Sequence, residues 1–276
     1  MKLMHLSDLH LGKRVNGFSM LEEQRFILEQ ILQLVHAEQP QGVLLAGDLF
    51  DKPTPPAEAV SLLDDFFAGL SHLGCTIFAI SGNHDSPERI AYGGRLLRHS
   101  GVHMSPVYGG SISPITLEDD LGPVDFYLLP FLKPAYLRSV MPETEIHSCQ
   151  EAVEKALEGL PVDPRRRNVL VAHQFVAGAQ VLEQEELLIG GSDGVDAALF
   201  RDFDYVALGH LHGPQSVGRD TLRYCGTPLK YSFAEASHHK SVTLVELDAK
   251  GQVTLNLLPL TPQHDLREIW GTYDQV

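Results

Sequence analysis

Three short apolar runs, separated by longer segments with helical spacing, fill the first hundred residues of the chain. The runs are residues 2–6, 42–46 and 76–80. Between them, residues 20–39 and 56–74 place apolar side chains three and four positions apart, as a helix with one buried face does. Parallel strands joined by helices need such long connections. The pattern therefore predicts an α/β fold in which helices cover a sheet.

The second half of the chain carries further short apolar runs. We predict strands at residues 124–130, 167–173, 204–210, 241–247 and 252–260. Some of these runs are separated by turns too short for a crossover helix, as in residues 213–228. Strands joined in this way pair antiparallel. We therefore expect this half to be more antiparallel than the first.

The composition limits the cellular setting. The first ten residues lack the apolar core of a signal peptide, and no apolar run reaches the ~18 residues that a membrane helix needs. The cysteines Cys75, Cys149 and Cys225 form no CxxC pair, so we expect reduced, buried thiols. We expect a soluble cytoplasmic protein without a membrane partner.

The charge of the chain is strongly negative. It has 21 Lys and Arg against 36 Asp and Glu, which gives a net charge of −15. Phosphate contacts need a basic surface, so this balance argues against unaided, non-specific binding of nucleic acid. One basic cluster, Arg165-Arg166-Arg167, follows two prolines. This cluster is either a solvated loop or a track for phosphate groups.

Polar side chains of the kinds that bind metals follow five of the apolar runs. They are Asp8 and His10, then Asp48, then Asn83 and His84, then His173, and finally His210 and His212. Open α/β sheets place their sites at the carboxyl ends of strands. A single histidine in such a place is usually structural. Five placements together predict one functional site at one edge of the fold.

The donor atoms of this set indicate the chemistry. Carboxylates, one amide oxygen and imidazoles, with no thiolate, suit Mn, Fe or Zn better than Mg or Ca. Without His84, seven candidate ligands remain, which are too many for one ion with an open position but suit two ions that share a carboxylate. Two divalent ions bring four positive charges, and Asp8 and Asp48 return only two negative ones. Such a site favours an anionic phosphate ester.

Five short motifs resemble those of the calcineurin-like metallophosphoesterases: SDLH, GDLFD, SGNHD, VAHQ and GHLH, which begin at residues 7, 47, 81, 171 and 209. Longer stretches along the whole chain look like the branch of that family whose bacterial members are DNA nuclease subunits that act with an ATPase in DNA-end processing. The resemblance implies an α/β fold of two mixed sheets, a sandwich flanked by helices. It also implies exonuclease and endonuclease activity on DNA in repair and recombination.

The same resemblance implies a role for each polar residue. One ion would be held by Asp8, His10 and His212, and the other by Asn83, His173 and His210, with Asp48 bridging the two. Manganese is the expected metal, with iron or zinc as alternatives. His84 would contact the scissile phosphate or its leaving oxygen. Asp85 would orient a neighbouring group, or would simply cap the loop.

The resemblance also implies domain limits and partners. Residues 1–260 would form the nuclease domain, and residues 261–276 an extension toward a capping domain and an ATPase-binding segment, which we expect to be absent from this chain. Relatives form homodimers through helices that match residues 60–70 and 88–101. The apolar residues Leu62, Phe66, Ile90 and Leu97 either lie outside the core and form this contact or pack within the chain.

Three other functions share parts of this pattern. A small-molecule or cyclic-nucleotide phosphodiesterase of the same fold would carry the same motifs and stays open. A protein phosphatase would typically have Arg-Gly after the second motif and Glu after the Asn-His pair, where this chain has Lys52-Pro53 and Asp85. A non-catalytic scaffold of this fold would lack the catalytic histidine, which is present here as His84.

Overall fold

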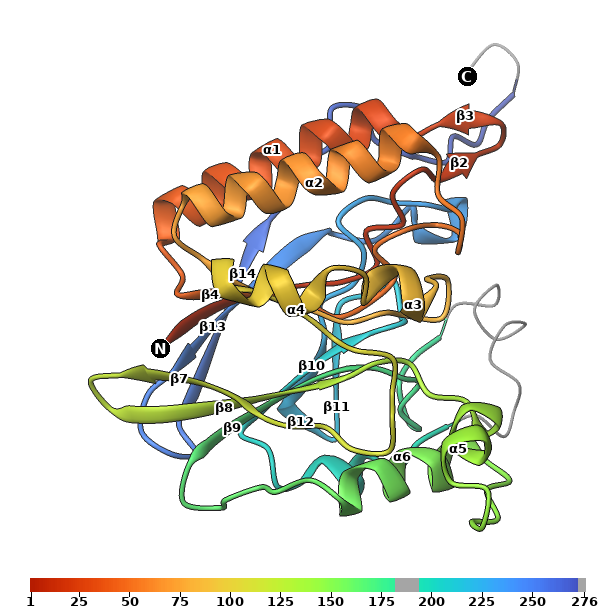
Figure 1. The fold of residues 1–276 in the computed structure, drawn as a ribbon. Coiled ribbons are helices and arrows are strands. Elements are labelled where there is room, and N and C mark those ends of the chain that lie inside the picture. The colour runs from red at the N-terminus through yellow and green to blue at the C-terminus, as the bar shows by residue number, and fades with distance from the viewer. Residues whose placement is uncertain (182–193, 273–276) are drawn as a thin grey trace.

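Two sheets packed face to face form the centre of the protein, in a computed structural model that describes residues 1–181 and 194–272 (Figure 1). Within these residues the first sheet has six strands in the order β14-β13-β1-β4-β5-β6. The strands are β1 (Lys2–Leu6), β4 (Gly42–Leu45), β5 (Thr76–Ala79), β6 (Val102–Met104), β13 (Ser241–Leu247) and β14 (Val253–Pro259).

The second sheet also has six strands in the described part of the chain, in the order β11-β12-β10-β9-β8-β7. The strands are β7 (Ile115–Asp119), β8 (Gly122–Leu129), β9 (Arg167–His173), β10 (Tyr205–Gly209), β11 (Gln215–Val217) and β12 (Arg219–Tyr224). A small hairpin of β2 (Arg14–Val15) and β3 (Phe18–Ser19) lies outside both sheets.

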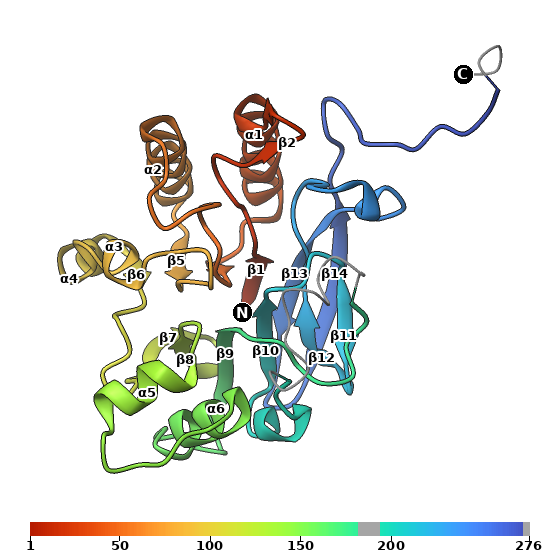
Figure 2. The same cartoon turned by 90° about the vertical axis from the view of Figure 1, so that its right-hand side faces the viewer.

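Helices cover the outer face of each sheet (Figure 2). The long helices α1 (Leu21–Glu38) and α2 (Ala57–His72) lie on the first sheet, and α5 (Pro134–Val140) and α6 (Cys149–Glu158) lie on the second. The short helices α3 (Pro87–Ile90) and α4 (Gly94–Leu97) follow β5. Three apolar cores result, one between the sheets and one under each helix layer. The predicted two-sheet sandwich flanked by helices is therefore confirmed.

Strand direction in the second sheet is mixed. Its central strands β8, β9, β10 and β12 are parallel, and only the edge pairs β7–β8 and β11–β12 are antiparallel. The connection from β8 to β9 contains α5 and α6, so it is long enough to cross over and return in the same direction. The antiparallel pairs β7–β8, β11–β12 and β13–β14 nevertheless make this half more antiparallel than the first, as expected.

The buried face of α2 excludes part of the candidate homodimer contact. Leu62 and Phe66 are buried against the first sheet, and so is Ile90, whereas Val60 is exposed. These three buried side chains are not available for a contact between two copies of the chain. Of the four candidate residues, only Leu97 is partly exposed, at 40%.

The basic cluster at residues 165–167 is already paired with carboxylates. Arg165 pairs with Asp163, Arg166 with Asp125, and Arg167 with Asp119. The third arginine is buried, and the cluster leads into the amino end of β9, whereas the candidate ligand His173 is at the carboxyl end of that strand. These ion pairs argue against a track for phosphate groups.

The last residues that the structure describes continue beyond the sheet. After β14 ends at Pro259, residues 260–272 contain neither helix nor strand. His264 pairs with Glu23 of α1, and Asp265 with Lys230. No helix among the described residues is long and apolar enough to cross a membrane.

Candidate metal centre

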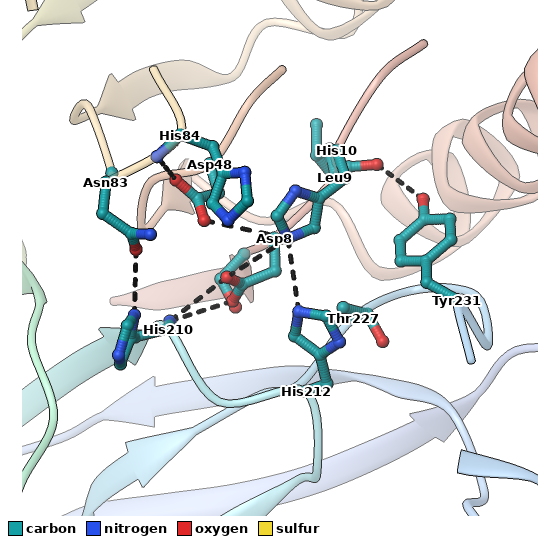
Figure 3. A network of polar contacts seen from close by, with 12 residues as sticks. Asp8, Leu9, His10, Asp48, Asn83, His84, His210, His212, Thr227 and Tyr231 are labelled. Atoms are coloured by element: carbon teal, nitrogen blue, oxygen red, sulfur yellow. Dashed lines mark hydrogen bonds and ion pairs between the residues drawn. The ribbon is translucent and has the colours of Figure 1, made fainter. Parts of the chain in front are cut away.

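The predicted ligands meet where the carboxyl ends of the parallel strands of both sheets lie (Figure 3). In the first sheet, β1, β4 and β5 end shortly before Asp8, Asp48 and Asn83. In the second sheet, β9 ends at His173 and β10 ends just before His210. Because the two sheets face each other, the five segments converge on one site.

The backbone at this site is held in an uncommon conformation. The non-glycine residues Asp8, His10, Asp48 and His210 have positive φ angles of 53°, 44°, 51° and 106°. Each such residue costs on the order of 1–3 kcal/mol and persists only where its surroundings hold it. Here the N–H of Asp8 donates to the carbonyl oxygen of Gly47 at 3.0 Å, and that of His10 to the carbonyl oxygen of Asp48 at 2.9 Å. Strain of this kind is typical of functional sites.

Asp8, His10 and His212 form the first cluster, with ligand atoms that all lie within 4.8 Å of one another. The Nε2 atoms of the two histidines are 3.3 Å apart. Nδ1 of His212 donates to Oε1 of Glu235 at 3.0 Å, so in the neutral ring Nε2 carries the lone pair. A cation beside the two Nε2 atoms fits this arrangement.

Asn83, His173 and His210 form the second cluster. The side-chain oxygen of Asn83 lies 2.9 Å from Nε2 of His173 and 2.9 Å from Nδ1 of His210. Nδ1 of His173 donates to the carbonyl oxygen of Ala46 at 2.7 Å. Once His173 loses its second proton, as a metal ligand must, its Nε2 presents a lone pair to the same space as the amide oxygen of Asn83. In that deprotonated state the cluster fits a cation held between these atoms.

Asp48 lies between the two clusters. Its Oδ2 atom is 3.7 Å from Nε2 of His10 and 3.5 Å from Nε2 of His173. Its Oδ1 atom accepts the backbone N–H of His84 at 2.8 Å. A Cβ atom at position 82 would collide with this carboxylate, which explains why Gly82 stands there. The place of Asp48 is the one that a bridging ligand requires.

The two buried carboxylates attract positive charge. Burial raises the pKa of Asp8. Burial opposes ionisation of Asp48 as well, but His173 and His10 beside it hold its pKa well below the usual range. Burial lowers the pKa of His173, but Asp48 and Asp8 outweigh this effect and raise it to about 9. Burial, together with His173, lowers the pKa of His210 to about 3.

His84 and Asp85 are adjacent in the chain but occupy different environments. Nδ1 of His84 donates to the carbonyl oxygen of Asp51 at 3.0 Å, and its ring packs edge-on to that of His10. The buried carboxylate of Asp85 instead accepts the backbone N–H groups of Gly82, Leu49 and Phe50 at 2.9–3.1 Å. Burial raises the pKa of Asp85 to about 6, helped by Asp48. The contacts of Asp85 agree with the loop-capping alternative.

Two supports of the first cluster were not predicted. Glu235, fully buried, also accepts hydrogen bonds from Lys240 at 2.6 Å and from Thr227 at 3.2 Å. Gln24 of α1 donates to the carbonyl oxygen of His10 at 2.8 Å and to Tyr231 at 3.0 Å. Both side chains come from segments without ligand-like motifs. The one signal in the sequence was Gln24, a polar residue at a position where the helical spacing of α1 predicts an apolar one.

An open cleft of about 630 Å³ leads to both clusters. His10, Asp48, Asn83, His84, His210 and His212 line its inner end. Its lining also comes from the segment after β8, from α5 and from the start of α6, and includes Phe131, Lys133 and Arg138. The cleft is wide enough to admit a substrate larger than a phosphate ion.

Comparisons with known proteins agree with this geometry. The sequence model of the calcineurin-like phosphoesterase family matches residues 1–214 of this chain. The SbcD subunit of the SbcCD nuclease of Staphylococcus epidermidis is 34% identical over 280 residues, which cover 100% of this chain and 74% of that protein. The same subunit of Staphylococcus saprophyticus is 34% identical over 278 residues, which cover 99% of this chain and 73% of that protein.

A solved structure resembles the fold as a whole. The crystal structure of a dimetal phosphatase from Danio rerio superposes with a TM-score of 0.56 and 12% sequence identity. The match covers 93% of this chain and 95% of that one. At this identity the likeness concerns the fold alone. The match of the family model to more than half of the chain, together with the two bacterial relatives, shows that the chain belongs to the calcineurin-like phosphoesterase family.

Proposed function

We propose that this chain is a phosphodiesterase that uses two divalent metal ions, with manganese as the first choice, to cut DNA. The position of Asp48 carries the proposal. One of its oxygens lies within 3.7 Å of a histidine nitrogen from each cluster. A single carboxylate between two sets of ligands supports two adjacent ions rather than one.

The residues present fit two ions. Asp8, His10 and His212 would hold one, and Asn83, His173 and His210 the other, with Asp48 between them. When bound, the two ions would activate a water molecule as the nucleophile and neutralise charge on the phosphoryl oxygens. His84 keeps its Nδ1 bonded to the carbonyl oxygen of Asp51, which orients Nε2 for the substrate. A protonated His84 can donate from Nε2 to the leaving oxygen.

DNA is the proposed substrate because both bacterial relatives are named as nuclease subunits. The site itself supports hydrolysis of phosphate esters in general. The net charge of −15 would oppose binding of DNA elsewhere on the surface, so the cleft must supply the attraction. We therefore expect DNA cutting that is weak and strongly sensitive to salt.

An assay with three substrates tests this function. The purified chain is incubated with Mn²⁺ and, in parallel, with linear duplex DNA, a cyclic nucleotide and a phosphopeptide. Cutting of the DNA, and its loss in the variant Asp48→Asn, would support the proposal. Hydrolysis of the cyclic nucleotide alone would replace it with a small-molecule phosphodiesterase.

We also propose two protein partners. Both relatives are named as components of the SbcCD nuclease, so an SbcC-type ATPase is the first candidate. A second copy of the chain is the other. Apolar side chains on neighbouring surface segments remain exposed: Val60 at 48%, Tyr92 at 86% and Leu96 at 78%. These residues, with Leu97, replace the buried ones that were candidates for the dimer contact.

Light scattering tests the homodimer. The unaltered chain at high micromolar concentration should have twice the mass of the monomer, and Leu96→Glu should shift it toward the monomer. The matched control is Leu257→Glu, because Leu257 is also exposed but lies on the distant edge strand β14. A monomer at every concentration would remove the proposal.

A further inference from the structure

Lys133 lies at the cleft, where the described residues offer it no partner of opposite charge. Among those that line the cleft, Asp48 is the one carboxylate, whereas Lys13, Lys133 and Arg138 are all basic. Lys13 is paired with Asp51 at 2.8 Å, and Arg138 donates to the carbonyl oxygen of Ile146. Within the described part of the chain, Lys133 has no ion pair. Its charge is therefore available to a ligand.

Phe131 fixes the distance between Lys133 and the metal centre. The Phe131 ring lies stacked on that of His210, with ring centroids 6.2 Å apart, and edge-on to that of His173 at 6.0 Å. The ammonium group of Lys133 lies 5.5 Å from the centroid of the same ring. The backbone N–H of Phe131 donates to the carbonyl oxygen of Ser81, two residues before Asn83. Lys133 is thus one aromatic ring away from the second cluster.

This separation decides what Lys133 can contact. The ammonium group of Lys133 contacts the Phe131 ring, and this ring contacts the histidine rings of the second cluster. We propose that Lys133 binds the phosphate next to the scissile one in the same DNA strand, with Phe131 as a fixed spacer. This inference rests on the proposed DNA cutting. It assigns a subsite that a small phosphodiester cannot occupy, because such a molecule has a single phosphate.

The cleft of an acidic protein offers few other positive charges to a nucleic acid. Exposed charge pairs contribute roughly 0.2–1 kcal/mol each, which corresponds to an effect of at most about fivefold. Loss of one phosphate contact to a single strand also lowers the slope of log affinity against log salt by about 0.7. The salt slope is therefore the sharper measure of this contact.

The test uses Lys133→Gln, which removes the charge and keeps much of the length. Lys133→Arg is the conservative variant, and Lys155→Gln, at an exposed lysine on α6 outside the cleft, is the matched control. Each variant is assayed with Mn²⁺ on a small aryl phosphodiester and on a short single-stranded oligodeoxynucleotide. Binding of the labelled oligodeoxynucleotide is followed by fluorescence anisotropy in EDTA at several salt concentrations.

We expect Lys133→Gln to keep kcat/KM for the small diester and to lower that for the oligodeoxynucleotide roughly twofold to fivefold. The slope of log affinity against log salt in EDTA should become shallower by about 0.7, and Lys133→Arg should restore it. Equal losses on both substrates, or an unchanged slope, would overturn the subsite alone. If the unaltered chain cuts the small diester but neither linear duplex DNA nor the oligodeoxynucleotide, the proposed nuclease function fails and the subsite with it.

Discussion

Nδ1 of His212 lies 3.0 Å from Oε1 of Glu235, so a buried carboxylate fixes the ring of a candidate metal ligand. Glu235 is itself held by Lys240 at 2.6 Å and by the backbone N–H of Tyr231 at 3.3 Å. The carboxylate cannot turn away from the histidine without losing these bonds. Carboxylate–histidine pairs of this kind tune metal sites, because they orient the ring and raise its basicity.

The first prediction concerns Glu235→Gln. The variant removes the negative charge that faces His212 and Lys240, so it should lower stability and weaken the partner that orients His212. We expect Mn²⁺ affinity at the first cluster to fall about 10- to 100-fold. Affinity at the second cluster should change little. Calorimetric titration with Mn²⁺, after removal of metal with EDTA, measures both.

Asp204→Asn is the matched control for this prediction. Asp204 is another buried carboxylate, and it accepts the backbone N–H groups of Asn168 and Gly251 at the amino end of β10. Its substitution should lower stability without changing either metal affinity. An equal loss of metal in both variants would mean that Glu235 acts through the fold and not on His212.

The second prediction concerns the bridge. Asp48 is within reach of ligands from both clusters, whereas His10 belongs to the first. Asp48→Asn should therefore lower occupancy of both metal positions, and His10→Ala chiefly of one. Anomalous scattering from crystals grown with Mn²⁺ distinguishes the two positions. Two fully occupied positions in Asp48→Asn would exclude the bridging role.

A third prediction concerns the stability of the fold. Arg167, buried at the start of β9, donates to Asp119 at 3.0 Å, and this bond holds the pKa of Asp119 well below its usual range. The carboxylate binds its proton less readily in the folded chain than in the unfolded chain, whose Asp pKa is about 3.9. The pair therefore stabilises the fold above that pH, and the effect is lost as the pH falls further.

Asp119→Asn measures this effect. The free energy of unfolding should fall by about 1.5–3 kcal/mol at pH 7, the range for hydrogen bonds to charged groups. The difference from the unaltered chain should shrink as the pH falls below about 4. Urea unfolding at a series of pH values provides the measurement. Asp163→Asn, which breaks the exposed pair with Arg165, should have little effect at any pH. A loss in Asp119→Asn that is constant with pH would contradict the assignment.

The positions of the candidate ligands could be read from the sequence because each follows a short apolar strand directly. Asp8, Asp48 and Asn83 come within four residues of a strand end, where the chain has little freedom. The distances between the clusters could not be read in this way. They depend on how the two sheets pack face to face, and no local pattern encodes that packing.

The buried face of α2 shows a second limit of sequence reasoning. Apolar residues occupy two overlapping stripes, one through Val60 and Phe67 and another through Leu62 and Phe66. Both have helical spacing, so the periodicity cannot choose between them. In the structure, Leu62 and Phe66 pack against the first sheet and are buried. Glu235 was missed for a related reason, since it lies in a short 3-10 turn, Phe233–Glu235, without any periodic pattern.

The last prediction separates chemistry from metal binding at His84. Nδ1 of this ring is bonded to the carbonyl oxygen of Asp51, and its backbone N–H to Asp48, so the side chain is positioned without any metal. If His84 acts on the leaving oxygen, His84→Ala should keep both Mn²⁺ affinities and lower kcat on a small aryl phosphodiester by roughly 10²- to 10⁴-fold. A diester whose leaving group is a strongly acidic phenol needs less protonation, so its loss of rate should be smaller. His99→Ala, at a histidine outside the cleft, is the control and should keep full activity. Loss of a metal ion in His84→Ala, or equal losses of rate for good and poor leaving groups, would show that this histidine has another role.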